Sequence, residues 1–135
     1  MAEEFQFRLV TPLAAVVDQP VIEVTAPGTL GEFGVLPNHA NLLSTLEVGR
    51  LTYKDARGQK TFAIREGFAE VSDNVMTVLA EGAIAADDID PAQTRADLAA
   101  AEAELATLSP TDPGFIDAEL RCRWAEARLA VAAGK

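Results

Sequence analysis

The sequence changes its pattern abruptly at about residue 87, and this break constrains the fold more than any other feature. Before it, apolar residues alternate with others, as Phe5, Phe7 and Leu9 do, which places them on one face of a strand. After it, the chain is rich in Ala, Leu, Glu and Arg, and most of these residues favour helices. The break predicts two units: a β unit over residues 1–86 and a helical hairpin over residues 87–135.

Within the β unit, turn residues such as Pro27-Gly28 and Asp73-Asn74 separate short β-rich runs. The runs cover residues 5–10, 14–18, 21–26, 46–53, 60–65, 68–72 and 75–79. Short strands at this spacing, with no helical segment between them, favour an antiparallel sandwich or barrel. Gln19-Pro20 is predicted as a turn. So is the segment from Gly31 to Gly34, because it lacks the third glycine, the lysine and the following helix of a phosphate-binding loop.

The hairpin has clear start and stop signals. Asp90-Pro91 supplies an N-cap followed by proline at the first helical position, which predicts a helix over about 91–108. The segment from Ser109 to Gly114 ends it, and Asp112-Pro113 repeats the cap-then-proline pattern. A second helix is therefore predicted over about 113–132, antiparallel to the first.

The second helix carries two apolar stripes where a surface helix normally has one. One stripe is Ile116, Leu120, Trp124, Ala127 and Val131. The other is Ala118, Cys122, Ala125, Leu129 and Ala132. We expect the small residues to face the first helix, and Leu120, Trp124, Ala127 and Val131 to form a face that docks on another surface. The alternative is a single weak pattern diluted by alanine.

Charge and residue counts exclude several classes of function. The net charge of −10 argues against a nucleic-acid partner, because that affinity rests on Lys and Arg. One His and one Cys leave too few side chains for a nucleophilic triad or for most metal sites, so we expect no catalytic, cofactor or metal site. Cys122 is expected to be a small buried hydrophobe. The chain has no run of about 18 apolar residues, so no transmembrane segment is expected.

One contiguous segment resembles a family signature. Residues 31–40 read Gly-Glu-Phe-Gly-Val-Leu-Pro-Asn-His-Ala. The epsilon subunit of rotary, F-type ATP synthases has the similar pattern G-E-x-G-I-L-P-x-H-A/T. The resemblance continues through Leu42–Leu46 with Gly49, and through Gly67–Val71 with Asn74 and Val75–Leu79. It is looser in the hairpin.

This resemblance implies a β-sandwich of about ten strands that binds the gamma subunit and the rotor ring of c subunits. It implies a non-catalytic role in coupling ring rotation to gamma, and contact of the ring or gamma with Glu32, Phe33, Gly34, Pro37 and His39. The hairpin is implied to fold on the sandwich or to extend towards the alpha and beta subunits, where it restrains ATP hydrolysis. The acidic N-terminus is unlike a transit peptide, so we expect a peripheral protein on the cytoplasmic face of a bacterial inner membrane. An organelle-encoded copy would look the same.

The sequence departs from one family pattern. Family members that bind ATP have I/L-D-x-x-R-A at the start of the first helix, and here Gln93 stands at the arginine position. Arg95 is two residues late, which turns its side chain by about 200° around the helix. We therefore expect the hairpin not to bind ATP. The competing hypothesis for the whole chain is a free-standing β-sandwich module that binds a ligand or a peptide.

Overall fold

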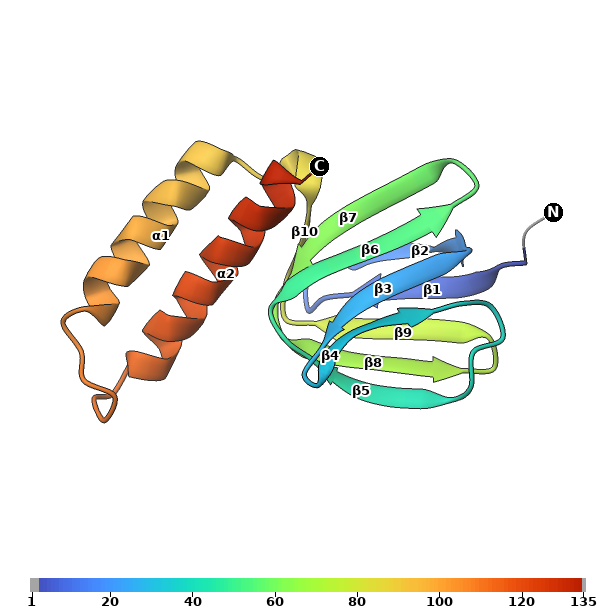
Figure 1. Cartoon of the computed structure of the whole chain (residues 1–135), viewed down its shortest axis with the longest axis horizontal. Coiled ribbons are helices and arrows are strands. Elements are labelled where there is room, and N and C mark those ends of the chain that lie inside the picture. Colours follow the sequence, from blue (N-terminus) through green and yellow to red (C-terminus); the bar gives the residue numbers. More distant parts are fainter. Residues whose placement is uncertain (1–2, 135) are drawn as a thin grey trace.

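The computed structural model describes residues 3–134, and it places two helices at one end of a two-layered β unit (Figure 1). The β unit contains ten strands. They are β1 (Phe5–Val10), β2 (Ala15–Val21), β3 (Glu23–Gly28), β4 (Gly31–Val35), β5 (Leu42–Leu46), β6 (Gly49–Asp55), β7 (Gly58–Ile64), β8 (Gly67–Ser72), β9 (Val75–Ala80) and β10 (Ala83–Ala85).

The strands form one continuous sheet that folds over itself. Its order is β10-β7-β6-β3-β5-β8-β9-β1-β2, with β4 added beside β3. One pair, Gly28 opposite Leu46, joins β3 to β5 and so connects the two layers. The antiparallel sandwich predicted from the sequence is confirmed with one departure, since β1 and β9 run parallel. These two strands are far apart in the chain, so a long connection can bring them side by side.

Two predicted turns are strands in the structure. Gln19 and Pro20 belong to β2, where Pro20 lies opposite Gln6. Proline is tolerated there because β2 is an edge strand with β1 as its neighbour. The segment from Gly31 to Gly34 belongs to β4. The turn itself is the pair Thr29-Leu30.

Glycine makes that turn possible. Gly28 and Gly31 lie opposite each other on either side of it, and Gly31 has a φ of 128°. A Cβ on Gly28 would lie 2.7 Å from the Gly31 carbonyl oxygen. The glycines of this segment therefore close a hairpin between two strands. The predicted runs also omit β10 entirely, and they include only the last residue of β5, Leu46.

The core of the β unit is built from its own residues. Its buried side chains lie between Phe5 and Ala85 and include Phe7, Leu9 and Met76. Tyr53 packs between two phenylalanines, with ring centroids 5.7 Å from Phe7 and 6.3 Å from Phe62. Because this cluster contains no hairpin residue, the β unit does not rely on the helices to complete its main core.

The helices are α1 (Pro91–Leu105) and α2 (Phe115–Ala133), preceded by the short 3-10 helix η1 (Ala86–Asp88). The Asp90 cap is confirmed, since its side chain accepts a hydrogen bond from the Gln93 amide at 3.2 Å. The helix α1 ends at Leu105, before the predicted 108, because the next amides bond in tighter turns, Thr107 to Glu104 and Leu108 to Leu105.

The predicted cap at Asp112 is wrong. The helix α2 begins at Phe115, after Gly114 in the left-handed conformation with a φ of 88°. The Asp112 carboxylate instead accepts a hydrogen bond from the Ser109 amide at 2.7 Å, which closes the loop between the helices. Among residues 3–134, no side chain donates to or accepts from the first turn of α2 as a cap, and Gly114 is the residue at the N-cap.

The helix α2 has a partner on each side. It packs against α1 on one side and against β7, β6 and η1 on the other (Figure 1). Ala118, Cys122 and Ala125 are buried, as expected for the small stripe. Towards the C-terminus the stripes merge, because Ala132 packs in the same cluster as Val131. At the opposite end Ile116 is 70% exposed.

Candidate functional site

The sequence-predicted site residues lie on β4 and on the turn that follows it. Glu32, Phe33 and Gly34 are in β4, which pairs with β3. Pro37 and His39 are in the turn, at the end of the β unit away from the helices, whereas β4 begins at the end near them (Figure 1). The structure therefore spreads these residues along one edge of the sheet. It does not gather them in one loop.

Phe33 differs from its neighbours because it is partly a core residue. It is half-buried and packs against the main cluster. A Cβ on Gly28 would lie 2.9 Å from its ring, so the two positions fit closely. Glu32 and Gly34 are exposed. Of the three, Glu32 is the side chain that β4 offers to a partner.

The turn after β4 is held by a side chain from another turn. Asn74, between β8 and β9, accepts a hydrogen bond from the Asn38 amide at 2.7 Å and donates one to the Glu4 carbonyl at 3.0 Å. Asn38 and Asn74 both have positive φ, 63° and 62°. His39 donates from Nδ1 to the Ala40 carbonyl at 2.7 Å, because a carbonyl can only accept. Sequence reasoning identified Asn74 as a motif residue and missed this anchoring role.

An exposed apolar row crosses the outer face of the sheet over β5, β8, β9 and β1. Strand register places Phe68 opposite Leu79, and Leu79 opposite Val10. Phe68 is 55% exposed and Leu79 52%. Leu43, 75% exposed, lies diagonal to Phe68 on the same face. We call Val10, Leu43, Phe68 and Leu79 the outer apolar row.

A charged row borders the apolar one. Glu70 lies opposite Thr77, Thr77 opposite Arg8, and Arg8 opposite Asp18. An apolar strip flanked by charged and polar groups is typical of a protein-binding surface. Sequence reasoning missed this surface. The available signal was the presence of Phe and Leu at the outward positions of β8 and β9, where alternation predicts polar residues.

The second candidate surface is the contact between α2 and the β unit. Val131 is buried in a small cluster with Ala63, Ala86 and Ile89, and Trp124 packs against its side. Ala127 is half-buried and lines a groove of about 330 Å³ with Val48 and Gly49. The predicted docking residue Leu120 is half-buried. Of the four residues predicted to form a docking face, the structure packs Val131 and Trp124 against residues of the β unit and of η1.

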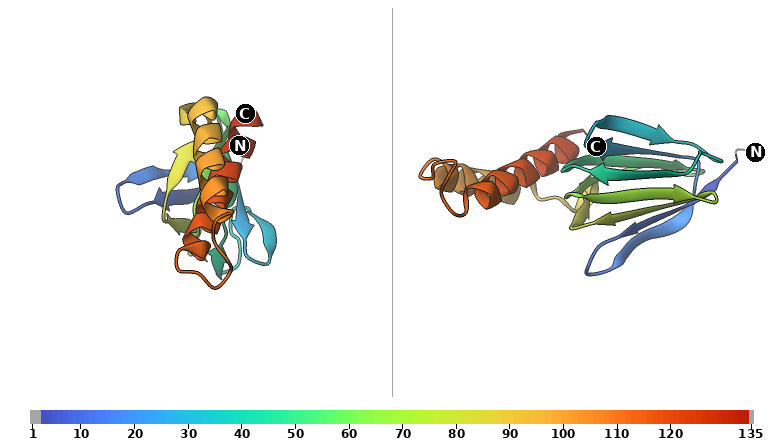
Figure 2. Two further views of the ribbon diagram at one scale, coloured as in Figure 1. Left: turned by 90° about the vertical axis from the view of Figure 1, so that its left-hand side faces the viewer. Right: turned by 90° about the horizontal axis from the view of Figure 1, so that it is seen from below.

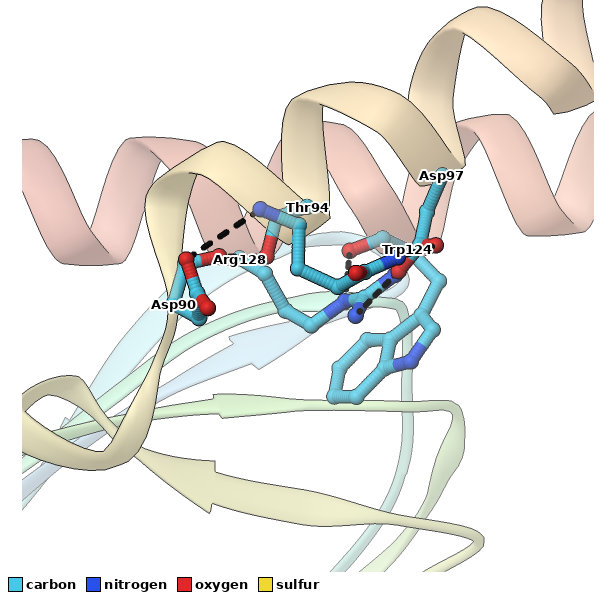
Figure 3. A network of polar contacts seen from close by, with 6 residues as sticks. Asp90, Thr94, Asp97, Trp124 and Arg128 are labelled. Carbon is cyan, nitrogen blue, oxygen red and sulfur yellow. Dashed lines mark hydrogen bonds and ion pairs between the residues drawn. The ribbon is translucent and has the colours of Figure 1, made fainter.

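A polar network ties the start of α1 to α2 (Figure 3). The Gln93 amide group donates to one oxygen of Asp97 at 3.0 Å, and Arg128 donates to the other at 3.4 Å. The Arg128 guanidinium also lies over the Trp124 ring, 5.1 Å from its centroid. Gln93, the departure from the family pattern, therefore helps to position Asp97 for an arginine of the other helix.

Their surroundings shift the pKa values of Cys122 and Asp55. Burial raises the pKa of the Cys122 thiol, which keeps it protonated and unreactive at neutral pH. Hydrogen bonds from the Arg57 amide, the Gln19 side chain and the Gly58 amide lower the pKa of Asp55, the last residue of β6. Within residues 3–134, no group of three or more His, Cys, Asp and Glu side chains is placed to hold a metal ion. No helix in that range has the length and apolarity to cross a bilayer.

Comparison with known proteins gives consistent matches. Residues 4–86 match the family model of the ATP synthase, Delta/Epsilon chain, beta-sandwich domain. The ATP synthase epsilon chain of Geotalea uraniireducens is 44% identical over 133 residues, covering 98% of this chain and 96% of the relative. The epsilon chain of Geobacter sulfurreducens is 43% identical over 132 residues, again covering 98% and 96%.

Solved structures give the same match. A chain in the structure of the Euglena gracilis mitochondrial ATP synthase (OSCP/F1/c-ring) superposes with a TM-score of 0.81 at 25% identity. The match covers 98% of this chain and 82% of that one. A chain from the central stalk and c-ring of the Tetrahymena thermophila mitochondrial enzyme, with a TM-score of 0.62 at 14% identity, shares the fold.

We predict that Asn74→Ala destabilises the chain by about 1–2 kcal/mol, because it removes two hydrogen bonds and places alanine at a positive φ. Asn74→Gly keeps the backbone conformation and should recover part of the loss. Urea denaturation curves of the three proteins measure this. Equal midpoints for the wild type and Asn74→Ala would show that Asn74 does not anchor the turn.

Proposed function

Because this chain belongs to the ATP synthase delta/epsilon chain family, we infer that it is the non-catalytic central-stalk subunit of an ATP synthase, coupling rotation of the c-ring to gamma. The observation that carries this inference is the match to epsilon chains over both units, covering 98% of this chain and 96% of the relative. A free-standing binding module would not need to share the hairpin as well as the sandwich. The protein is a peripheral part of a membrane complex.

The outer apolar row supports docking on gamma. In the isolated chain Phe68 and Leu79 leave about half of their surface in water, which a permanent partner would cover. Arg8, Asp18 and Glu70, beside the row, can form charged contacts at its rim. We assign this face to the foot of gamma.

The edge formed by β4 supports contact with the rotor ring or gamma. The exposed Glu32 and the anchored turn with Pro37 and His39 offer polar groups along one side of the sandwich. A rigid edge suits a part that transmits torque, because a loose loop would yield under load. Gly34 leaves open space beside the strand, so a partner backbone can approach closely.

The hairpin supports a second role, restraint of ATP hydrolysis through contact with the alpha and beta subunits. Its packing on the β unit comes mainly from one side of α2, and the main core contains no hairpin residue, so the hairpin can detach without disturbing that core. The docking face of α2 then becomes available to another partner. Location on the cytoplasmic face of the membrane is part of the same proposal.

The hairpin is proposed not to bind ATP. Arg65, Arg121 and Arg128 line one groove, and a cluster of arginines is where a polyphosphate would bind. However, Arg121 is already paired with Glu104 and Asp117, and Arg128 with Asp97. These acidic partners compete with phosphate oxygens, and Gln93 contributes no charge.

We predict that Phe68→Asp weakens binding to gamma by at least about 100-fold, because it replaces an apolar contact by a carboxylate that would be buried. Pull-down of gamma by the tagged chain, or titration with purified gamma, measures the change. The matched control is Leu13→Asp, which alters an equally apolar residue, 96% exposed, in the turn between β1 and β2. Equal loss in both variants would argue against the outer apolar row as the gamma surface.

We predict that removal of residues 91–135 raises ATP hydrolysis by the assembled complex several-fold, while assembly itself is retained. The main core lies within the β unit, so the shortened chain should still fold and bind gamma. Hydrolysis is measured in complexes matched for their content of this subunit. An unchanged rate in a complex of normal composition would remove restraint of hydrolysis from the proposed role.

We predict no saturable binding of ATP and magnesium to the isolated chain at sub-millimolar concentrations. Gln93→Arg restores the charge at the family position and provides the comparison, with an expected gain of about ten- to a hundredfold in affinity. Isothermal titration measures both proteins. Binding by the wild type at these concentrations would show that Gln93 does not prevent nucleotide recognition.

A further inference from the structure

The hairpin is attached to the β unit through α2. The packing surfaces of α2 reach β7, β6 and η1, whereas α1 packs against α2 and lies on the outer side (Figures 1 and 2). The buried cluster at this contact is small, and it joins Val131 of α2 to Ala63, Ala86 and Ile89. Two of its four members are alanines, so it buries little apolar surface.

The polar contacts across the same interface are weak. The ion pair between Arg123 and Glu47 spans 3.8 Å, and both side chains are about half exposed. Arg50 donates to the Ala130 carbonyl at 3.4 Å, at the long limit of a hydrogen bond. Exposed ion pairs of this kind add little to stability and are screened by salt.

Trp124 is the largest side chain at this interface, and two guanidinium groups lie over its ring. Arg128, one turn further along α2, lies 5.1 Å from the ring centroid. Arg65, in the turn between β7 and β8, lies 5.9 Å from it. The two cations come from different units, so the ring connects α2 to the β unit directly. Arginine over the face of tryptophan is the favoured geometry for a cation–π contact.

Both arginines are held in place by further contacts. The Arg65 amide donates to the Gly82 carbonyl at 2.9 Å. Its side chain passes over Gly82, where an added Cβ would lie 2.9 Å from Cδ. Arg128 is fixed from the side of α1 by Asp97, which Gln93 holds in turn (Figure 3). The contact of Trp124 with the β unit is therefore linked to the packing of α1 on α2.

We propose that Trp124, in contact with both Arg65 and Arg128, is the latch that holds the docked hairpin on the β unit. When Arg65 releases the ring, α1 and α2 leave as one body, because Arg128 and Asp97 keep the helices joined. This deepens the proposed role of the hairpin, and its regulatory meaning rests on that role. The latch itself can be measured in the isolated chain, without any other subunit.

The test follows docking by methyl NMR of the full chain. The Ala63 methyl group, packed against Val131, reports docking from outside the latch. Val131→Asp, which places a carboxylate in the cluster, supplies the detached reference. Arg65→Ala is expected to move the Ala63 signal towards this reference, with a fall of about two- to fivefold in the ratio of docked to detached hairpin. Gly82→Ala, which displaces the Arg65 side chain without removing it, should shift the signal in the same direction.

Arg57→Ala is the matched control, because it removes an exposed arginine in the turn between β6 and β7, at the other end of the β unit. It should leave the Ala63 signal unchanged. The wild type should remain docked at about 1 M salt, where exposed ion pairs are screened. An unmoved signal in Arg65→Ala, or loss of docking in high salt, would overturn the latch. Neither result would bear on the proposed binding of gamma, which the Phe68 variant tests separately.

Discussion

The parallel pairing of β1 with β9 is the contact on which the rest of the molecule depends. It joins the first strand of the chain to one of its last, with Phe7 beside Met76, and both side chains are fully buried. Without it, β5, β8 and β9 would end in an open edge, and β2 would have no place in the sheet. The same pairing sets Leu79 beside Val10, so the outer apolar row exists because this register does. The face that we assign to gamma is a consequence of how the core closes.

Much of this architecture could be predicted from patterns among residues close together in the sequence. The change of composition near residue 87, the alternation in β1 and the Asp90-Pro91 start of α1 each depend on residues close together in the chain, and each led to a correct element. The signature at residues 31–40 identified the family, although the turn predicted for its first four residues was wrong. A glycine-rich segment favours the prediction of a turn, because glycine tolerates the backbone conformations that tight turns require. Only the register with β3 shows that the turn is at Thr29-Leu30 and that Gly31–Val35 is a strand.

What the sequence could not show depends on contacts between distant residues. Pro20 is acceptable in β2 because that strand is at an edge, and edge position is a property of the whole sheet. Asn74 anchors a turn 36 residues away, which no pattern around either residue indicates. The outer apolar row is likewise made of single residues from separate strands. Each looks like an ordinary exposed side chain until register brings them together.

Gln93 has a packing role at the start of α1. It stands at the arginine position of the sequence pattern with which this segment was compared. Its amide is neutral, and it bonds to Asp97 through the helix spacing of four residues. Asp97 is then oriented towards Arg128, whose guanidinium stacks on Trp124. A positive charge at position 93 would instead compete with Arg128 for the same carboxylate. Of the arginines that line the groove at Trp124, Arg121 and Arg128 are thus paired with carboxylates, and Arg128 and Arg65 contact the Trp124 ring where α2 meets the β unit.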